Sequence, residues 1–180
     1  IVVCGGPDIN YRDDWIRNYL LRNSFINYLV PFNGEIPLLN IVQGELFGNS
    51  QEARSVQGAY YLEGDEKQLI FKELETKLES LNAAPSPYLT GLMDKFFPTA
   101  QSDFKLAPFV ETNRGCPYQC TFCHTANSKY NKLIYKGNDV FKEEMDLFAQ
   151  RMKDFPDIPL YIADNNFGMF NRDNEIADIV

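Results

Sequence analysis

Three of the four cysteines in this chain, Cys116, Cys120 and Cys123, lie on one short stretch with the spacing C-x₃-C-x₂-C. Thiolates are soft metal ligands, and three of them on so short a loop can converge on a single metal centre. A tetrahedral zinc ion would need a fourth protein ligand, whereas a [4Fe–4S] cluster held by three cysteines leaves one iron open for another molecule. The spacing therefore favours a metal-binding loop.

The segments on either side of the loop predict an α/β arrangement. The apolar run from Leu106 to Thr112 predicts a buried strand that leads directly into the loop. Such strand ends are where α/β barrels and open parallel sheets place their sites. After the loop, Asn138 is predicted to cap a helix that runs to about Met152. Its apolar stripe consists of Phe141, Met145, Phe148 and Met152.

The next elements complete a β-loop-α-β-α pattern. Leu160 to Asp164 predicts a second strand, Asn165 to Gly168 a loop, and Asp173 the start of a further helix. This order is typical of the beginning of a barrel or an open parallel sheet. Asp164 and Asn165 are therefore predicted to lie at the same end of the sheet as the cysteine loop.

The cysteines also allow other interpretations. A structural zinc site could use them together with the neighbouring His124, although consecutive ligands at positions 123 and 124 would strain a tetrahedron. The thiols could instead form a disulfide or remain inert. His124, the only histidine, could act as a base or ligand, or be an ordinary loop residue.

The motif resembles the signature of the radical SAM enzymes, C-x₃-C-x-aromatic-C, with Phe122 as the aromatic residue. In that family the signature follows the first strand of a partial (β/α) barrel. The flanking segments 111–118 and 85–91 resemble the subclass that carries an N-terminal cobalamin-binding domain. The resemblance is strong over residues 106–124 and diffuse over most of the remaining chain.

The resemblance implies a [4Fe–4S] cluster held by Cys116, Cys120 and Cys123. Its open iron would chelate the amino and carboxylate groups of S-adenosylmethionine (SAM), and one electron would then release a 5′-deoxyadenosyl radical. The protein would hold the cofactor and exclude water. The electron would come from an external donor such as flavodoxin or ferredoxin.

Three further residues are implied as contacts to SAM. Phe122 would lie beside the adenine, and Asp164 or Asn165 would accept a hydrogen bond from the methionine ammonium group. The alternatives are that Phe122 packs beneath the loop and that Asp164 and Asn165 form a turn capping the strand end. Arg114 could position a carboxylate or simply be a surface residue.

The N-terminal part predicts the end of a doubly wound domain. Residues 1–7 read as a strand and glycine turn, and Asp13 or Asp14 can cap a helix through about Asn23. A second strand is predicted from Phe25 to Val30 and a second helix from Glu35 to Phe47. The second helix carries one apolar side, formed by Leu38, Leu39, Val42 and Leu46.

Residues 58–105 are predicted to separate two domains. A hairpin is expected from two β-prone runs, 58–62 and 67–71, around a Gly-Asp turn. The rest of this segment carries three prolines and few regular patterns, as an ordered linker would. The predicted division is residues 1–57 for the end of the Rossmann-like domain, 58–105 for the hairpin and linker, and 106–180 for the start of the barrel.

Cobalamin is a hypothesis for the first domain. The turn Cys4-Gly5-Gly6-Pro7 resembles a glycine turn of cobalamin-binding domains, where the backbone must approach a corrin closely. The D-x-H-x-x-G motif of that family, whose histidine ligates cobalt, is absent from this sequence. Cys4 is most simply a small buried hydrophobic residue.

Composition limits the partners that we expect. The net charge of −8 and the lack of a long Lys/Arg cluster argue against nucleic acid as the main partner. No apolar run is long enough to span a bilayer, and clustered cysteines are unlike a secreted disulfide framework, which favours a cytoplasmic protein. The chain begins without methionine and stops within an amphipathic pattern, so it reads as a fragment.

The sequence thus predicts part of a radical SAM enzyme that cleaves SAM reductively, with radical methyl transfer as the outcome if cobalamin is bound. The substrate is unknown, and residues 1–180 are not expected to turn over alone. Two alternatives remain: an iron–sulfur protein that only transfers electrons, and a zinc-stabilised interaction module.

Overall fold

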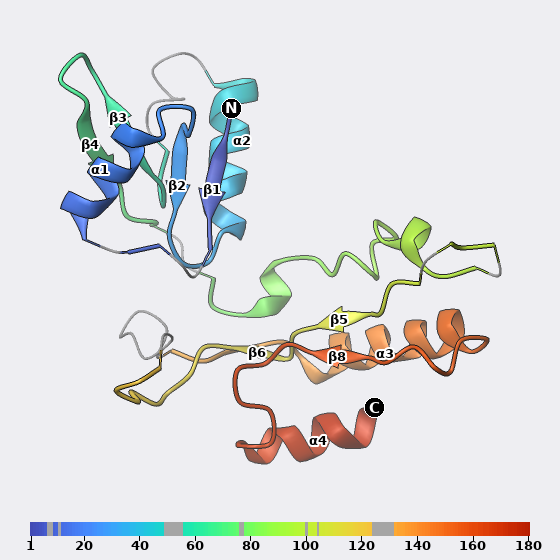
Figure 1. Ribbon diagram of the computed structural model, residues 1–180. Helices are drawn as coiled ribbons and strands as arrows, with labels where there is room; N and C mark the ends of the chain where they lie inside the picture. The colour runs from blue at the N-terminus through green and yellow to red at the C-terminus, as the bar shows by residue number, and fades with distance from the viewer. Residues whose placement is uncertain are drawn as a thin grey trace. The chain divides into compact units, whose positions relative to one another are not determined.

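The computed structural model describes residues 1–6, 9–10, 12–48, 56–75, 78–99, 101–103, 105–123 and 132–180, with Phe47 described through its backbone alone. The chain forms two compact units, Ile1–Leu78 and Glu79–Val180. Both combine helices with short strands (Figure 1), so the predicted α/β class is confirmed.

The first unit is built on a four-stranded mixed sheet. Its strands are β1 (Val3–Gly5), β2 (Tyr28–Val30), β3 (Tyr60–Glu63) and β4 (Gln68–Phe71), in that spatial order. β1 and β2 are parallel, as the strand–helix–strand pattern predicts, while β3 runs antiparallel to both β2 and β4. The predicted second strand is shorter than expected, because it begins at Tyr28 rather than Phe25.

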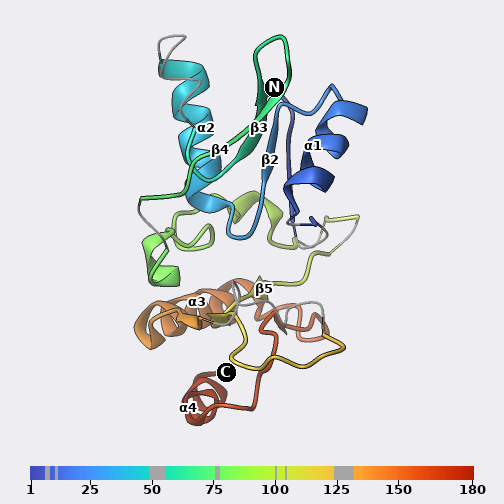
Figure 2. The same ribbon diagram turned by 90° about the vertical axis from the view of Figure 1, so that its left-hand side faces the viewer.

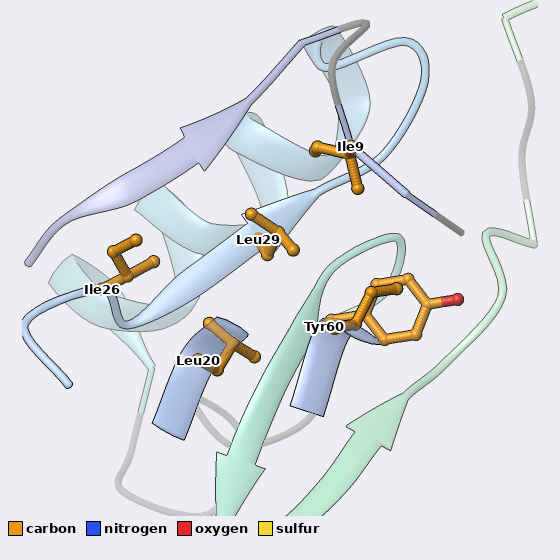
Figure 3. Packing of buried hydrophobic residues seen from close by; sticks show 6 residues of the cluster. Ile9, Leu20, Ile26, Leu29 and Tyr60 are labelled. Atoms are coloured by element: carbon orange, nitrogen blue, oxygen red, sulfur yellow. The ribbon is translucent and has the colours of Figure 1, made fainter. Parts of the chain in front are cut away.

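Two helices, α1 (Asp13–Arg22) and α2 (Glu35–Phe47), cover opposite faces of this sheet (Figures 1 and 2). Successive strand residues point to opposite faces, so β2 contributes to two cores. Leu29 packs on the α1 side (Figure 3), in a cluster of Ile9, Ile16, Leu20, Ile26, Leu29 and Tyr60. Tyr28 and Val30 pack on the α2 side, in a cluster of Tyr28, Val30, Ile41, Val56, Ala59 and Tyr61.

The start of α1 differs from the prediction that an aspartate caps it. Arg12 occupies the N-cap position with extended backbone and makes no side-chain cap hydrogen bond. Asp13 and Asp14 lie inside the first turn, where carboxylates interact favourably with the helix dipole. Arg12 donates to Asp14 from Nε at 3.1 Å and from a terminal nitrogen at 2.7 Å, and these hydrogen bonds lower the pKa of Asp14.

Helix α2 has the predicted bounds but packs through a different face from the one marked by the leucines. Leu38, Leu39, Val42 and Leu46 are exposed, with exposed fractions of 40–68%. Pro37 and Ile41 are buried instead, and Ile41 packs against β2. Apolar residues surround most of this helix, so periodicity alone does not indicate which side the sheet covers.

Replacing Ile41 with alanine should therefore lower the free energy of unfolding by about 2–5 kcal/mol, the usual cost of a cavity left by a buried aliphatic side chain. The matched change Leu38→Ala should alter it by no more than about 0.5 kcal/mol, as surface substitutions do. Urea unfolding followed by circular dichroism measures both. Equal losses for the two variants would mean that Leu38 lies against an apolar partner.

The predicted hairpin is confirmed. β3 and β4 pair from Tyr60 opposite Phe71 to Glu63 opposite Gln68. Gly64, at φ +70°, begins the turn, and its carbonyl accepts a hydrogen bond from the Lys67 amide at 3.2 Å. The hairpin continues the sheet of the first unit, so this unit extends to Leu78, past the division predicted at residue 57.

The second unit contains the predicted β-loop-α-β-α order. Its elements are β5 (Phe109–Val110), α3 (Asn138–Met152), β8 (Tyr161–Ile162) and α4 (Asn171–Ile179), and β5 pairs with β8 in parallel. Gly137, rather than Asn138, is the N-cap of α3. The predicted stripe of α3 packs into a core of Val110, Phe141, Met145, Phe148 and Ile176, with Met152 at its border.

Two strands of this unit were not predicted. β6 (Asn113–Arg114) directly precedes the cysteine loop and pairs antiparallel with β7 (Ile134–Tyr135), which lies between that loop and α3. Both contain only two residues, too few for alternation to be visible in the sequence.

Residues from the predicted linker pack onto the second unit, which begins at Glu79. This segment includes two 3₁₀ turns, η2 (Leu81–Ala83) and η3 (Asp94–Phe96). The Tyr88 hydroxyl donates to the Phe109 carbonyl at 2.9 Å and accepts from the Phe109 amide at 3.1 Å. Asn82 accepts from the Gly137 amide at 2.8 Å. Within the described ranges, no helix is long and apolar enough to cross a membrane.

Candidate metal and cofactor site

The two parallel strands of the second unit bring the predicted site residues to one edge of the sheet. The segment leaving β5 contains Thr112 and Cys116, and the segment leaving β8 contains Asp164 and Asn166. Hydrogen bonds join these segments, among them those from Thr112 to Asp164 and from Asn166 to Cys116. The carboxyl ends of β5 and β8 therefore form a common polar edge, as the sequence predicts.

The Asp164 carboxylate accepts four hydrogen bonds at this edge. Its Oδ1 accepts from the backbone amides of Thr112 at 2.7 Å and Asn113 at 3.2 Å. Its Oδ2 accepts from the Thr112 hydroxyl and from the Asn113 side-chain amide, the latter at 2.8 Å. Thr112 and Asn113 are almost fully buried, with exposed fractions of 0% and 1%.

These four hydrogen bonds occupy the roughly four lone-pair sites of a carboxylate. Asp164 therefore joins the end of β8 to the end of β5. This role is similar to the alternative prediction that Asp164 caps the strand end. A contact between Asp164 and the ammonium group of SAM stays a prediction, and it would require one of these bonds to be exchanged. Asn165, the other predicted contact, is exposed.

The cysteine loop begins with a glycine in a conformation that other residues rarely adopt. Gly115 has φ +108°, in the region that favours glycine, and directly precedes Cys116. Cys116 is buried, with an exposed fraction of 7%, whereas Cys120 and Cys123 are exposed. The Cys123 amide donates to the Cys120 carbonyl at 3.0 Å, which folds this end of the loop into a turn.

The donor set fits a three-cysteine cluster in its chemistry. All four cysteines are described and none forms a disulfide, so the predicted disulfide alternative is not observed. Within the described ranges, however, no three cysteine, histidine or acidic side chains are close enough together to hold a metal ion. Cys120 and Cys123 would therefore have to move toward Cys116 on binding a cluster, since metal binding and local folding are coupled.

The sequence did not predict a hydrogen bond that Asn166 donates to Cys116. The side-chain amide of Asn166 donates to the Cys116 sulfur, with Nδ2 and Sγ 3.0 Å apart. The only signal for it was that Asn166 belongs to a run of polar residues after a predicted strand, at the edge where the cysteines were also expected. Because the two residues are 50 positions apart, the sequence alone does not show that they form a pair.

The other site residues named from the sequence are Arg114, Phe122 and His124. Arg114 makes a two-pronged ion pair with Glu111, at 2.8 and 2.7 Å, so the carboxylate that it contacts belongs to its own strand region. Phe122 is 91% exposed and does not pack beneath the loop in this structure. Its predicted contact with adenine stays a prediction. His124 lies outside the described residues.

A charged network also supports this edge and was not predicted. Arg172 of α4 donates to the carbonyl and hydroxyl of Thr112, at 3.4 and 3.3 Å, and to the Lys136 carbonyl. Lys136 in turn forms an ion pair with Glu144 of α3 at 2.6 Å. Side chains of α3 and α4 therefore support the residues that follow β5 and β7.

In the first unit, glycine is favoured at positions 5 and 6 of the turn for two different physical reasons. A Cβ at Gly5 would lie 3.0 Å from the Val30 carbonyl oxygen, so close strand pairing favours glycine there. Gly6 has φ +117° and faces open space. Residues 1–78 contain no histidine, so any cobalamin at this turn would be held without a histidine ligand from this unit.

None of the protein-family models that were compared with the chain matches it. Two curated proteins do. The 2-(S-pantetheinyl)-carbapenam-3-carboxylate methyltransferase of Streptantibioticus cattleyicolor is 32% identical over 98% of the chain. The cobalamin-dependent radical SAM methyltransferase TokK of Streptomyces tokunonensis is 30% identical over 98% of the chain. The chain spans 25% of the length of each relative.

Solved structures share the fold. The apo cobalamin-dependent S-adenosylmethionine radical enzyme OxsB matches 98% of this chain, and 23% of its own length, with a TM-score of 0.65 and 22% identity. The radical S-adenosylmethionine methyltransferase TsrM of Kitasatospora setae matches 97% of this chain and 32% of its own, with a TM-score of 0.60 and 16% identity. Together with the cysteine motif, the two curated relatives show that the chain belongs to the radical SAM enzymes, in the subclass that carries a cobalamin-binding domain.

Proposed function

We propose that the protein containing this chain is a radical SAM enzyme whose [4Fe–4S] cluster is held by Cys116, Cys120 and Cys123. The first unit would be the end of a Rossmann-like, cobalamin-binding-type domain, and the second the start of the (β/α) barrel. The observation that carries the proposal is the position of the cysteine loop, which leaves β5 and meets the end of β8 through the bond between Cys116 and Asn166.

When bound, the cluster would supply the electron that cleaves a carbon–sulfur bond of SAM. The residues of this chain would bind and orient the reactants. Cys116, which is buried, and Cys120 and Cys123, which are exposed, would supply the three thiolates that hold the cluster. Phe122 is exposed beside them and would contact the adenine of SAM. Asn165 is the exposed polar side chain available to the methionine ammonium.

The proposed outcome is cobalamin-dependent methyl transfer, because both curated relatives are methyltransferases and TokK is described as cobalamin-dependent. An external one-electron donor such as flavodoxin or ferredoxin would reduce the cluster, and the reducing cytoplasm would keep the three thiols available.

Cluster loading tests the proposal directly. In the anaerobically reconstituted full-length protein, replacing Cys116, Cys120 or Cys123 with serine should abolish the iron and sulfide content of a [4Fe–4S] cluster, because three thiolates are its whole protein ligand set. Cys4→Ser is the matched control, since Cys4 lies in the first unit and should leave loading unchanged. Mössbauer spectra and iron and sulfide analysis measure the loss. Full loading in the three loop variants would refute the proposal.

The same preparation separates the alternatives. Incubation with SAM and dithionite should yield 5′-deoxyadenosine from the radical SAM enzyme, whereas an electron-transfer protein would hold the cluster and yield none. A zinc-stabilised interaction module would contain zinc without iron or sulfide after anaerobic purification.

A further inference from the structure

We propose that Asn166 is a positioning residue for the cluster, whose side-chain amide hydrogen-bonds the Cys116 sulfur, holds this ligand in place and raises the reduction potential of the cluster. This inference rests on the proposed function, because it concerns the reduction potential of the cluster that the three cysteines are proposed to hold.

The contact links two segments that are far apart in the sequence. Nδ2 of Asn166 lies 3.0 Å from Sγ of Cys116, a close approach for a nitrogen donor and a sulfur acceptor. Cys116 has an exposed fraction of 7%, and Asn166 is half-buried. Water therefore has little access to this sulfur, and the asparagine amide supplies the hydrogen bond that solvent would otherwise provide.

Bonds on both sides fix the loop that carries Asn166. Two residues before it, Asp164 is tied to Thr112 and Asn113 by four hydrogen bonds. Two residues after it, the Gly168 amide donates to Oδ2 of Asp173 at 2.8 Å, and Asp173 is itself buried in the first turn of α4. The loop is thus pinned at both ends, and the amide of Asn166 is oriented before any cluster is bound.

This arrangement has a predictable electrostatic effect. Reducing the cluster by one electron adds negative charge that spreads onto the ligand sulfurs. A hydrogen bond to a sulfur stabilises the more negative state, and hydrogen bonding and solvent exposure are among the features that set cluster potentials. The effect is larger where the sulfur is shielded from water. Among the three ligands, Cys116 is the buried one, so the hydrogen bond that Asn166 donates to it should matter most.

The test compares variants of the full-length, anaerobically reconstituted protein. Asn166→Asp keeps the shape of the side chain but replaces the donor with a negative oxygen, Asn166→Ala removes the side chain, and Asn166→Gln retains a donor. Asn174→Ala, on the exposed surface of α4, is the matched control. Redox titration monitored by electron paramagnetic resonance measures the cluster potential of each variant, with no need for turnover.

We expect Asn166→Ala to lower the ratio of reduced to oxidised cluster about tenfold at a fixed potential, a shift of about 59 mV for one electron. Asn166→Asp should lower it further, Asn166→Gln should recover part of the loss, and Asn174→Ala should match the unmodified protein. Unchanged potentials in fully loaded Asp and Ala variants would overturn the inference.

Cluster loading distinguishes the remaining outcomes. If the Asp and Ala variants load poorly while the Gln variant loads fully, the result supports the part of the inference in which Asn166 holds Cys116. If all three Asn166 variants load poorly, the hydrogen bond is not the cause and the inference fails. If the unmodified protein forms no [4Fe–4S] cluster, the proposed function itself fails.

Discussion

Replacing Asp164 with alanine is expected to lower the free energy of unfolding of the second unit by about 3–5 kcal/mol, because the change leaves several buried donors without acceptors. The backbone amides of Thr112 and Asn113 both donate to Oδ1 of Asp164. Each unsatisfied buried donor costs about 1–3 kcal/mol. The side-chain donors of the same two residues lose their acceptor as well.

Urea unfolding measures this loss, and hydrogen exchange at the amides of residues 112 and 113 locates it. Asp164→Asn should have an intermediate effect, since its single carbonyl oxygen can satisfy the donors on only one side. Asp154→Ala is the matched control, because Asp154 is exposed and should change the stability by no more than about 0.5 kcal/mol. If Asp164→Ala were as stable as this control, Asp164 would not join the ends of β5 and β8.

Sequence patterns predicted the elements whose signal is local. Helix α3 was predicted from its apolar stripe, which packs into the core around Phe141, and the β3–β4 hairpin from two β-prone runs around a Gly-Asp turn. The parallel pairing of β5 with β8 follows from a helix between two apolar runs. For the helix and the hairpin, the residues that decide the structure are close together in the chain, whereas the β5–β8 pairing joins strands about 50 residues apart and follows from the order of the elements.

The features that the sequence did not predict depend on distant partners. The bonds of Asp164 to Thr112 and of Asn166 to Cys116 join residues 50 or more positions apart. A single sequence can place such residues at the same edge of a sheet, but cannot pair them. The buried face of α2 could not be predicted for a different reason. Apolar residues lie on most sides of this helix, so no contrast between apolar and polar sides marks the one that packs on the sheet.

Replacing Lys136 with methionine is expected to lower the free energy of unfolding by about 3–5 kcal/mol, the usual cost of leaving a buried charge without its partner. The Lys136 Nζ lies 2.6 Å from Oε2 of Glu144, and the side chains are 13% and 1% exposed. The other oxygen, Oε1 of Glu144, has no hydrogen-bond partner within the described part of the chain. Without Lys136, the carboxylate would therefore be buried and uncompensated. Urea unfolding of the variant measures the loss.

A double-mutant cycle separates the value of the pair from the cost of breaking it. Adding Glu144→Leu to Lys136→Met should recover most of the lost stability, because two well-packed apolar side chains can replace a buried ion pair at little cost. The matched control is Lys142→Met. The Nζ of Lys142 lies 3.0 Å from Oδ2 of Asp146, but these two side chains are 62% and 69% exposed. Water screens that pair, so its loss should cost no more than about 0.5 kcal/mol. A double variant as unstable as Lys136→Met alone would mean that the loss does not come from leaving the Glu144 carboxylate without its partner.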